Sequence, residues 1–181
     1  MPQENIIPGC VAALRDVKNH KGLINAFSQV LQVIGNTTLV IVGSGPLAEA
    51  LQQQAHALKI AGQVIFTGQK DNIGQYLKAF DLFVLNSKTE GLSYAVLEAM
   101  SSGLPVVATH VGGNAQIINH DTDGLLYEEG NETALSDTLV QILKNPEKIR
   151  FMGKQAREKI LQDYSLEAMV KQYDRLYQGL V

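Results

Sequence analysis

The sequence predicts an α/β fold built around one parallel sheet, and three observations support this class. Short apolar runs rich in Val, Ile and Leu alternate with longer segments whose apolar residues recur every three to four positions. The short runs are apolar throughout, which is typical of strands that helices cover on both faces. Of the 181 residues, 45% are hydrophobic and 18% are charged, a balance that supports a buried core and excludes disorder.

Six apolar segments are the expected strands. They cover residues 10–14, 39–42, 64–66, 82–85, 105–108 and 125–127. A segment with helical character follows each of the first four, and helices that join parallel strands make right-handed crossovers. The segments therefore predict a Rossmann-like, doubly wound parallel sheet of six strands.

The helices are expected from apolar stripes at helical spacing and from residues that favour helix ends. Those between strands cover residues 22–34, a segment that begins at Pro46, residues 73–79 and residues 92–101. The last third is helical from about residue 131, where Asn131, Asn145 and Ser165 are the expected N-caps of three helices. These elements use the whole length, so we expect one domain over residues 1–181.

Composition and charge exclude several classes of function. The net charge of -3 and the pI of about 5.8 differ from those of a general nucleic-acid binder, which is normally basic. No apolar run spans a bilayer, and residues 1–5 lack the regions of a signal peptide. The single cysteine, Cys10, excludes an internal disulfide, and the four histidines lack metal-ligand spacing, so we expect no metal site. We therefore expect a cytoplasmic protein, or one at the inner face of the membrane.

Two glycine loops lie at the carboxyl ends of the expected strands, where such sheets bind ligands. The loop 43–48, Gly-Ser-Gly-Pro-Leu-Ala, fits the G-x-G-x-x-A form of the dinucleotide fingerprint. However, no acidic residue ends the next strand to bind a ribose, and a tight strand-to-helix turn explains the loop equally well. The paired glycines Gly112 and Gly113 likewise either admit a ligand close to the backbone or form a turn.

Charged residues at the same edge suggest an anion-binding site. Arg15 and Lys18 follow the first strand, and both side chains suit phosphate oxygens, although the loop taken alone favours a solvated basic turn. Glu90 and Glu98 lie eight residues apart, just over two helical turns, so both carboxylates could reach one ligand. The helix start between them presents backbone N–H groups that favour a phosphate.

Taken together, these motifs resemble the C-terminal, nucleotide-sugar-binding domain of family 4 retaining glycosyltransferases of the GT-B fold (glycosyl transferases group 1). The most specific part runs from Glu90 to Thr109 and is similar to the family's E-x7-E segment and the strand that follows it. The segments 39–47, 64–68, 111–113 and 123–126 stand in the family's order and spacing, so the resemblance covers nearly the whole chain.

The resemblance implies a role for each residue of the candidate site. Glu90 would orient the donor sugar through its hydroxyl groups, and Glu98 would bind the nucleotide ribose. Arg15 and Lys18 would bind the diphosphate and stabilise it as leaving group, so the catalytic residues would be Glu90, Arg15 and Lys18. The remaining implied donor-binding residues are Gly43, Gly68, Gln69 and Lys70, of which the last three would contact the base, and Gly91, Leu92, Ser93, Tyr94 and Ala95, near sugar and phosphate. The implied substrate is a UDP-, GDP- or ADP-linked sugar, with no cofactor.

Two positions depart from the family's pattern. Ala13 stands where the family usually has an arginine. Arg15 follows two residues later and points to the same side of an extended segment, so we assign the arginine's role to it. Gln116 stands where a glutamate is frequent, which we interpret as structural variation.

Enzymes of the GT-B fold hold the acceptor in a second domain. The first strand begins near residue 10, so we expect the N-terminal acceptor domain to be absent from this chain. The isolated chain would then bind donor without catalysing transfer, and any membrane contact would come through the missing half.

The last helix carries an apolar stripe that this missing half would cover. It consists of Leu166, Met169, Val170, Tyr173, Leu176 and Tyr177. We expect its distal end, residues 173–177, to be less buried than the strand residues Val40, Ile41, Val84 and Val107.

Three alternatives remain open at this stage. A GT-B-like nucleotide-sugar epimerase would use the same donor site. A non-catalytic module would bind a nucleotide or a partner through the same loops. A dinucleotide-dependent dehydrogenase is disfavoured because the acidic ribose-binding residue is missing.

Overall fold

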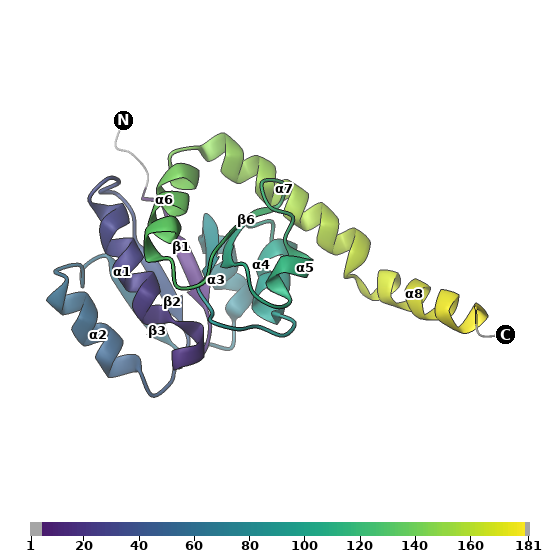
Figure 1. Ribbon diagram of the computed structural model, residues 1–181, viewed down its shortest axis with the longest axis horizontal. Coiled ribbons are helices and arrows are strands. Elements are labelled where there is room, and N and C mark those ends of the chain that lie inside the picture. Colours follow the sequence, from purple (N-terminus) through teal and green to yellow (C-terminus); the bar gives the residue numbers. More distant parts are fainter. Residues whose placement is uncertain (1–4, 180–181) are drawn as a thin grey trace.

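A computed structural model describes residues 5–179 and has the predicted sheet at its centre (Figure 1). The six strands are β1 (Pro8–Val11), β2 (Leu39–Val42), β3 (Val64–Gly68), β4 (Leu82–Leu85), β5 (Val106–Thr109) and β6 (Gly124–Tyr127). All pair in parallel, in the order β3-β2-β1-β4-β5-β6, which confirms the doubly wound sheet. The order changes direction between β1 and β4, so the topological switch point lies there. The segment examined above for a signal peptide lies almost wholly outside the described residues.

Helices cover both faces of this sheet. They are α1 (His20–Leu31), α2 (Ala48–Ala57), α3 (Ile73–Ala79), α4 (Tyr94–Ser101), α5 (Asn114–Ile117), α6 (Glu132–Leu143), α7 (Pro146–Asp163) and α8 (Leu166–Gln178), with a 3-10 turn, η1 (Asp16–Lys18), before α1. One core contains Phe27 of α1 and Leu135 of α6, and the other contains Met100 of α4 and Phe83 of β4. These four side chains are fully buried.

The first strand differs from its prediction because of how its neighbours end. It starts at Pro8, two residues early, and stops at Val11 instead of residue 14. Beyond Val11 the chain turns over the end of β2, where the Ala12 and Leu14 amides donate to the carbonyls of Val42 and Ser44. The segment that carries Ala13 and Arg15 therefore stays bonded to the chain that follows β2, at the carboxyl edge of the sheet.

Four helices also differ from their predictions, and two of them differ only in their bounds: α1 covers His20–Leu31 instead of residues 22–34, and α2 begins at Ala48 instead of Pro46. Helix α4 begins at Tyr94 rather than Leu92, because the preceding residues stay in a loop whose carbonyls, at Glu90 and Gly91, accept from the Gly113 amide. Helix α5 was not predicted, since four residues are too few to show a helical stripe.

The three predicted N-caps of the last third are confirmed. The side chains of Asn131, Asn145 and Ser165 accept from the amides of Ala134, Lys148 and Ala168, respectively. Each satisfies one of the amides that a helix start leaves without an intrahelical partner.

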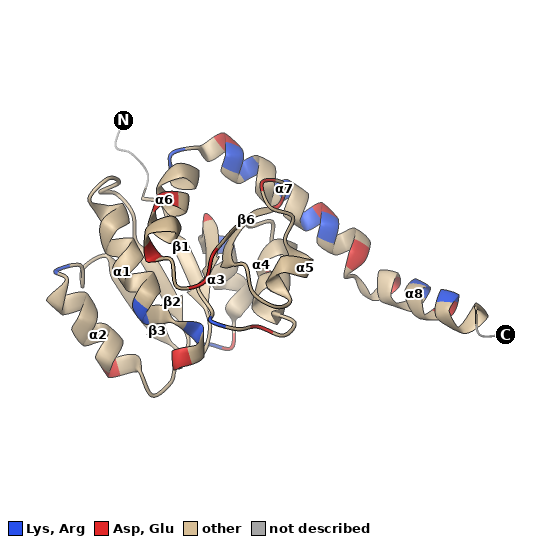
Figure 2. Ribbon diagram, viewed as in Figure 1, with Lys and Arg blue, Asp and Glu red and all other residues tan. Residues whose placement is uncertain are grey.

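Helix α7 joins the two faces of the sheet. Its Met152 belongs to the core with α1 and α6, whereas its Ala156 packs with α4. Lys159 fixes the helix to the loop before β6, because its Nζ lies 3.3 Å from Oδ2 of the buried Asp123 and also donates to the Ile117 carbonyl. Burial raises the pKa of Asp123 even though Lys159 favours its charged form. Elsewhere α7 bears charges of both signs on its surface (Figure 2), as its interleaved sequence predicts.

Helix α8 projects away from the body of the molecule (Figure 1). Tyr173, Leu176 and Tyr177 are 54%, 57% and 64% exposed, against 9% or less for the four strand residues of the comparison, so the prediction is confirmed. The exposure extends over the whole stripe, since Leu166, Met169 and Val170 are also exposed. No helix within residues 5–179 is long and apolar enough to cross a membrane.

Candidate functional site

The loops after β1 and β4 meet at the switch point through an ion pair. The Lys18 Nζ lies 2.6 Å from Oε1 of Glu90, with the two side chains 25% and 8% exposed. Ser87, which is buried at the start of the loop after β4, also contributes, because its hydroxyl donates to the same oxygen at 2.6 Å. The structure therefore brings two predicted site residues into contact and sequesters their charges together.

Helix α4 starts directly beside Glu90 and leaves its first amides available. The Ser93 side chain stands at the N-cap but accepts no capping bond from the helix. The amides at the first turn of a helix have no intrahelical partner, and they carry the positive end of the helix dipole. Tyr94 and Ala95 form this first turn, while Gly91, Leu92 and Ser93 precede it.

A cavity of about 330 Å³ opens over the carboxyl ends of β1, β2 and β3, and neither Lys18 nor Glu90 is among its lining residues. Three predicted site residues line it, namely Gly43, Gln69 and Lys70. Ala13, which stands in place of an arginine, lines it as well. Gly68 closes the end of β3 next to it, with its carbonyl accepting from the Gly43 amide at 2.9 Å. The cavity has room for a planar ring with polar groups at its edge.

The paired glycines of the loop after β5 serve backbone packing. A Cβ on Gly112 would stand 1.8 Å from the Glu90 carbonyl oxygen, and one on Gly113 would stand 2.0 Å from that of Gly91. Gly43 meets the same constraint at Ala12, where the distance would be 2.0 Å. These glycines let the loops approach one another closely, which supports their interpretation as turn residues. A ligand contact at Gly43 stays a prediction.

A buried histidine, His20, contacts the loop after β1 that carries Arg15 and Lys18, called the basic loop below. His20 accepts at Nδ1 from the Cys10 thiol, 3.9 Å away, and its Nε2 lies 3.2 Å from the Ala13 carbonyl oxygen. Because a carbonyl can only accept, the neutral ring carries its hydrogen on Nε2. Burial lowers the pKa of His20 and raises the pKa of Cys10 to about 12, so both groups stay neutral.

Two further buried side chains, those of Asn86 and Tyr127, hold the turn between Lys18 and His20 in place. Asn19 adopts a left-handed conformation with φ 45°, and its side chain caps α1 by accepting from the Gly22 amide. The Asn86 amide donates to the Asn19 carbonyl at 3.0 Å, and the Tyr127 hydroxyl donates to Asn86 at 2.6 Å. The end of β4 and the end of β6 thus hold the basic loop in one position.

Arg15 and Glu98 remain apart from the ion pair. Arg15 is exposed directly before η1, and its amide donates to the Ala13 carbonyl at 2.8 Å, so the chain bends at Leu14 and is not the extended segment assumed above. Glu98 is exposed one turn into α4. Within residues 5–179 neither side chain forms an ion pair, so their predicted ligand contacts stay predictions.

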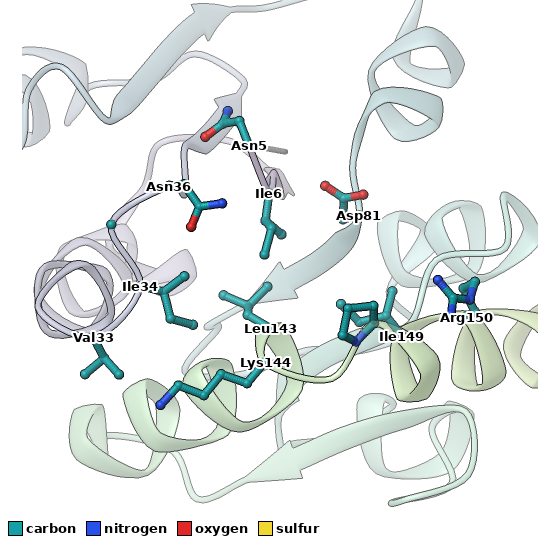
Figure 3. Close-up of a pocket in the computed structure, with 12 residues that line it drawn as sticks. Asn5, Ile6, Val33, Ile34, Asn36, Asp81, Leu143, Lys144, Ile149 and Arg150 are labelled. Carbon is teal, nitrogen blue, oxygen red and sulfur yellow. The ribbon is translucent and has the colours of Figure 1, made fainter. Parts of the chain in front are cut away.

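A larger cavity lies elsewhere. It measures about 520 Å³, and Asn5, Asp81 and Lys144 are among its lining residues (Figure 3). It opens at the amino ends of β1 and β4, on the opposite edge of the sheet from Glu90, and contains none of the predicted site residues. In doubly wound sheets ligands bind at the carboxyl edge, so we place the candidate site in the smaller cavity and beside α4.

Sequence reasoning missed several residues that shape this site. Ser87, Asn86 and His20 each contact a predicted residue or its neighbour, yet none belongs to a motif considered above. A usable signal existed for the first two, because they are polar residues that directly follow a fully apolar strand. Among the described residues no three His, Cys, Asp or Glu side chains gather where a metal ion could bind.

Fold and site together define a doubly wound α/β domain with an ion pair and an uncapped helix start at its switch point. Residues 2–159 match the family model described as Glycosyl transferases group 1, and the chain belongs to this family. The family and the relatives below are glycosyltransferases, which decides against the epimerase and the dehydrogenase.

Named relatives are longer than this chain. An N-acetyl-alpha-D-glucosaminyl L-malate synthase of Bacillus anthracis is 34% identical over 167 residues, which cover 92% of this chain and 44% of the relative. A GDP-mannose-dependent mannosyltransferase of Mycobacterium tuberculosis is 29% identical over 158 residues, covering 82% and 41%. The structure of S. aureus TarM in complex with UDP, at 26% identity, superposes with a TM-score of 0.88 and covers 96% of this chain and 35% of TarM. The chain therefore spans less than half of each.

The buried His20 predicts a stability that falls in weak acid. Its lowered native pKa means that, as pH drops below about 6.5, the unfolded chain binds a proton that the native imidazole does not. The free energy of unfolding should fall with a slope of at most about 1.4 kcal/mol per pH unit from this group. Urea unfolding of wild type and His20→Gln between pH 7 and 5 measures it, and the variant should show a shallower slope.

The exposed His56 provides the control for this experiment. His56→Gln should keep the pH slope of the wild type. Equal slopes for wild type and His20→Gln would show that His20 does not govern the acid response.

Proposed function

We propose that this chain is the donor-binding domain of a retaining glycosyltransferase, which binds a nucleotide diphosphate sugar for transfer to an acceptor held by a separate N-terminal domain. One observation carries the proposal: a lysine, a carboxylate and an open helix start converge at the switch point of a sheet that belongs to this family. The lysine and the open helix start can bind an anion, and the carboxylate can accept a hydrogen bond from a sugar hydroxyl.

Each part of the donor has a matching group in this proposal. The base occupies the cavity lined by Gly43, Gln69 and Lys70, next to Gly68. The diphosphate lies between Lys18, Arg15 and the first amides of α4, contributed by residues 91–95. The sugar faces Glu90, and the ribose meets Glu98. A TarM structure that contains UDP supports this class of ligand.

Transfer then depends on stabilising the leaving group. As the bond between the anomeric carbon and the diphosphate breaks, negative charge grows on the phosphate oxygens, and Arg15, Lys18 and the amides of α4 lie where they can offset it. These protein groups supply positive charge without a metal ion. Glu90 orients the sugar and is not required to form a covalent bond. Retention of anomeric configuration is part of the proposal.

The exposed face of α8 fits the acceptor domain as its partner. A large apolar side chain gains about 1.5–3 kcal/mol on burial, so an exposed stripe of six is costly in water. The named relatives contain more than twice the length that this chain covers, which leaves room for a domain against which α8 would pack. Any membrane contact of such a protein would come through that domain, and its location would be the cytoplasm or the inner face of the membrane.

A ligand panel tests the proposed function. Thermal unfolding of the 181-residue chain is followed with UDP, GDP and ADP and with UDP-N-acetylglucosamine, UDP-glucose, GDP-mannose and ADP-glucose. A ligand that binds only the native state raises the midpoint, by about 2.7 kcal/mol of stability at a hundred times its Kd. At least one diphosphate and its sugar should do so. A flat response to all seven would reject donor binding.

Removal of the proposed phosphate ligands should weaken binding of the nucleoside diphosphate. Arg15→Ala and Lys18→Ala each remove a charge-assisted contact of about 1.5–3 kcal/mol, so each Kd should rise roughly 10-fold or more by calorimetry. Lys78→Ala removes an equal charge from the exposed end of α3 and serves as control. Unchanged affinity in both site variants would exclude the phosphate role.

The two glutamates should differ in which ligand they affect. Glu90→Gln should weaken the nucleotide sugar more than the bare diphosphate, since Glu90 faces the sugar. Glu98→Gln should weaken both, because the ribose is common to them. Glu158→Gln, on the surface of α7, should change neither. If Glu90→Gln and Glu98→Gln each weakened the nucleotide sugar and the bare diphosphate by the same factor, the assignment of separate roles would be wrong.

The partner of α8 is tested by hydrogen exchange. Amides of Leu166–Gln178 should exchange fast in the 181-residue chain. They should exchange slowly in a chimera that joins this chain to the part of the Bacillus anthracis relative it does not cover. Helix α6, buried in both proteins, is the internal control. Equally fast exchange of α8 in both would argue against docking on an acceptor domain.

A further inference from the structure

A buried serine lies directly behind the carboxylate that faces the donor sugar. The Ser87 hydroxyl donates to Oε1 of Glu90 at 2.6 Å, and the Lys18 Nζ reaches the same oxygen at 2.6 Å. Within the described residues no group donates to Oε2 of Glu90. Because both donors bind Oε1, the other carboxylate oxygen, Oε2, can accept hydrogen bonds from a ligand.

Ser87 is itself held from behind by two buried residues. The Thr109 hydroxyl donates to the Ser87 carbonyl at 2.7 Å, and the Asn114 amide donates to the Thr109 carbonyl at 3.2 Å. All three residues are fully buried, and they link α5 through the ends of β5 and β4 to Glu90. Ser87 is therefore a fixed point within the site.

Lys18 is a different kind of partner. Its side chain is partly exposed, and its ammonium ends a flexible four-carbon stem. In the proposed function it binds the diphosphate, so its contact with Glu90 weakens when the donor arrives. The serine hydroxyl has no competing ligand and keeps its bond.

We propose that Ser87 is a positioning residue for donor-sugar recognition. Its hydroxyl holds Oε1 of Glu90 while Lys18 turns to the diphosphate, so that Oε2 stays directed toward the sugar. A carboxylate held by a group with a fixed backbone loses less conformational entropy when it binds a hydroxyl. This inference rests on the proposed function and adds separate roles for Ser87 and Lys18, the two residues that donate to Glu90.

The test compares two ligands in Ser87→Ala. The probes are UDP and UDP-N-acetylglucosamine, or GDP and GDP-mannose if the guanine pair is the one that binds wild type. Loss of a hydrogen bond to a charged group should weaken the nucleotide sugar roughly 10-fold by calorimetry. The bare diphosphate should keep its affinity, because Lys18 and Arg15 are intact. Ser87→Thr, which restores a hydroxyl, should restore the ratio of the two dissociation constants.

Ser136→Ala is a matched control. Ser136 is also buried, and its hydroxyl donates to Oε1 of Gln29 and to the Thr133 carbonyl in α6. This variant should lose stability without any change in the ratio of the two dissociation constants. An unchanged ratio in folded Ser87→Ala, or an equal loss for both ligands, would overturn the positioning role.

A measurement without ligand separates this inference from the proposed function. The free energies of unfolding of Ser87→Ala, Glu90→Ala and the double variant form a cycle, in which each single variant removes the bond between the two side chains. If the hydroxyl holds Glu90, the double variant loses less stability than the sum of the single losses. Additive losses would overturn the contact whatever the ligands do. Binding of none of the seven panel ligands to wild type would instead overturn the proposed function, and with it the sugar role of Ser87.

Discussion

The close approach of backbone segments at the carboxyl edge is the constraint on which the site depends. Gly112 and Gly113 lie against the carbonyls of Glu90 and Gly91, where any side chain would collide. This contact keeps residues 90–93 out of the helix and so decides where α4 begins. The position of the helix start then decides where its open amides stand relative to Glu90. A packing requirement between loops therefore determines the geometry of the charged groups.

The layout of the sheet was predictable from sequence because it depends on local patterns. β2, β4 and α3 occur at their predicted residues, and the caps Asn131, Asn145 and Ser165 act as expected. Apolar runs that helices cover on both faces specify strands without reference to distant residues. The ends of β1 and α4 were wrong by two or three residues, because contacts with loops far away in sequence decide them.

The candidate site was predictable in its residues and only partly in its contacts. Lys18 and Glu90 were both expected at the edge, but as ligands of different parts of a donor, and their mutual ion pair was not foreseen. Ser87 and His20 were missed because their roles arise from burial beside another element, which no spacing rule contains. Arg15 illustrates the same limit, because alternation was applied to an extended segment, whereas the chain bends at Leu14 and the Arg15 amide donates to the Ala13 carbonyl.

The pairing of Lys18 with Glu90 also affects how fast an anion can find the site. At rest the two charges cancel, so at distances beyond the Debye length, about 8 Å at physiological salt, this pair exerts almost no pull on a diphosphate. Arg15 and Lys70, which are exposed and outside the ion pair, are left to provide attraction at long range. In the proposed function such exposed cations govern the association rate of the diphosphate, and Lys18 contributes after contact, through the lifetime of the complex.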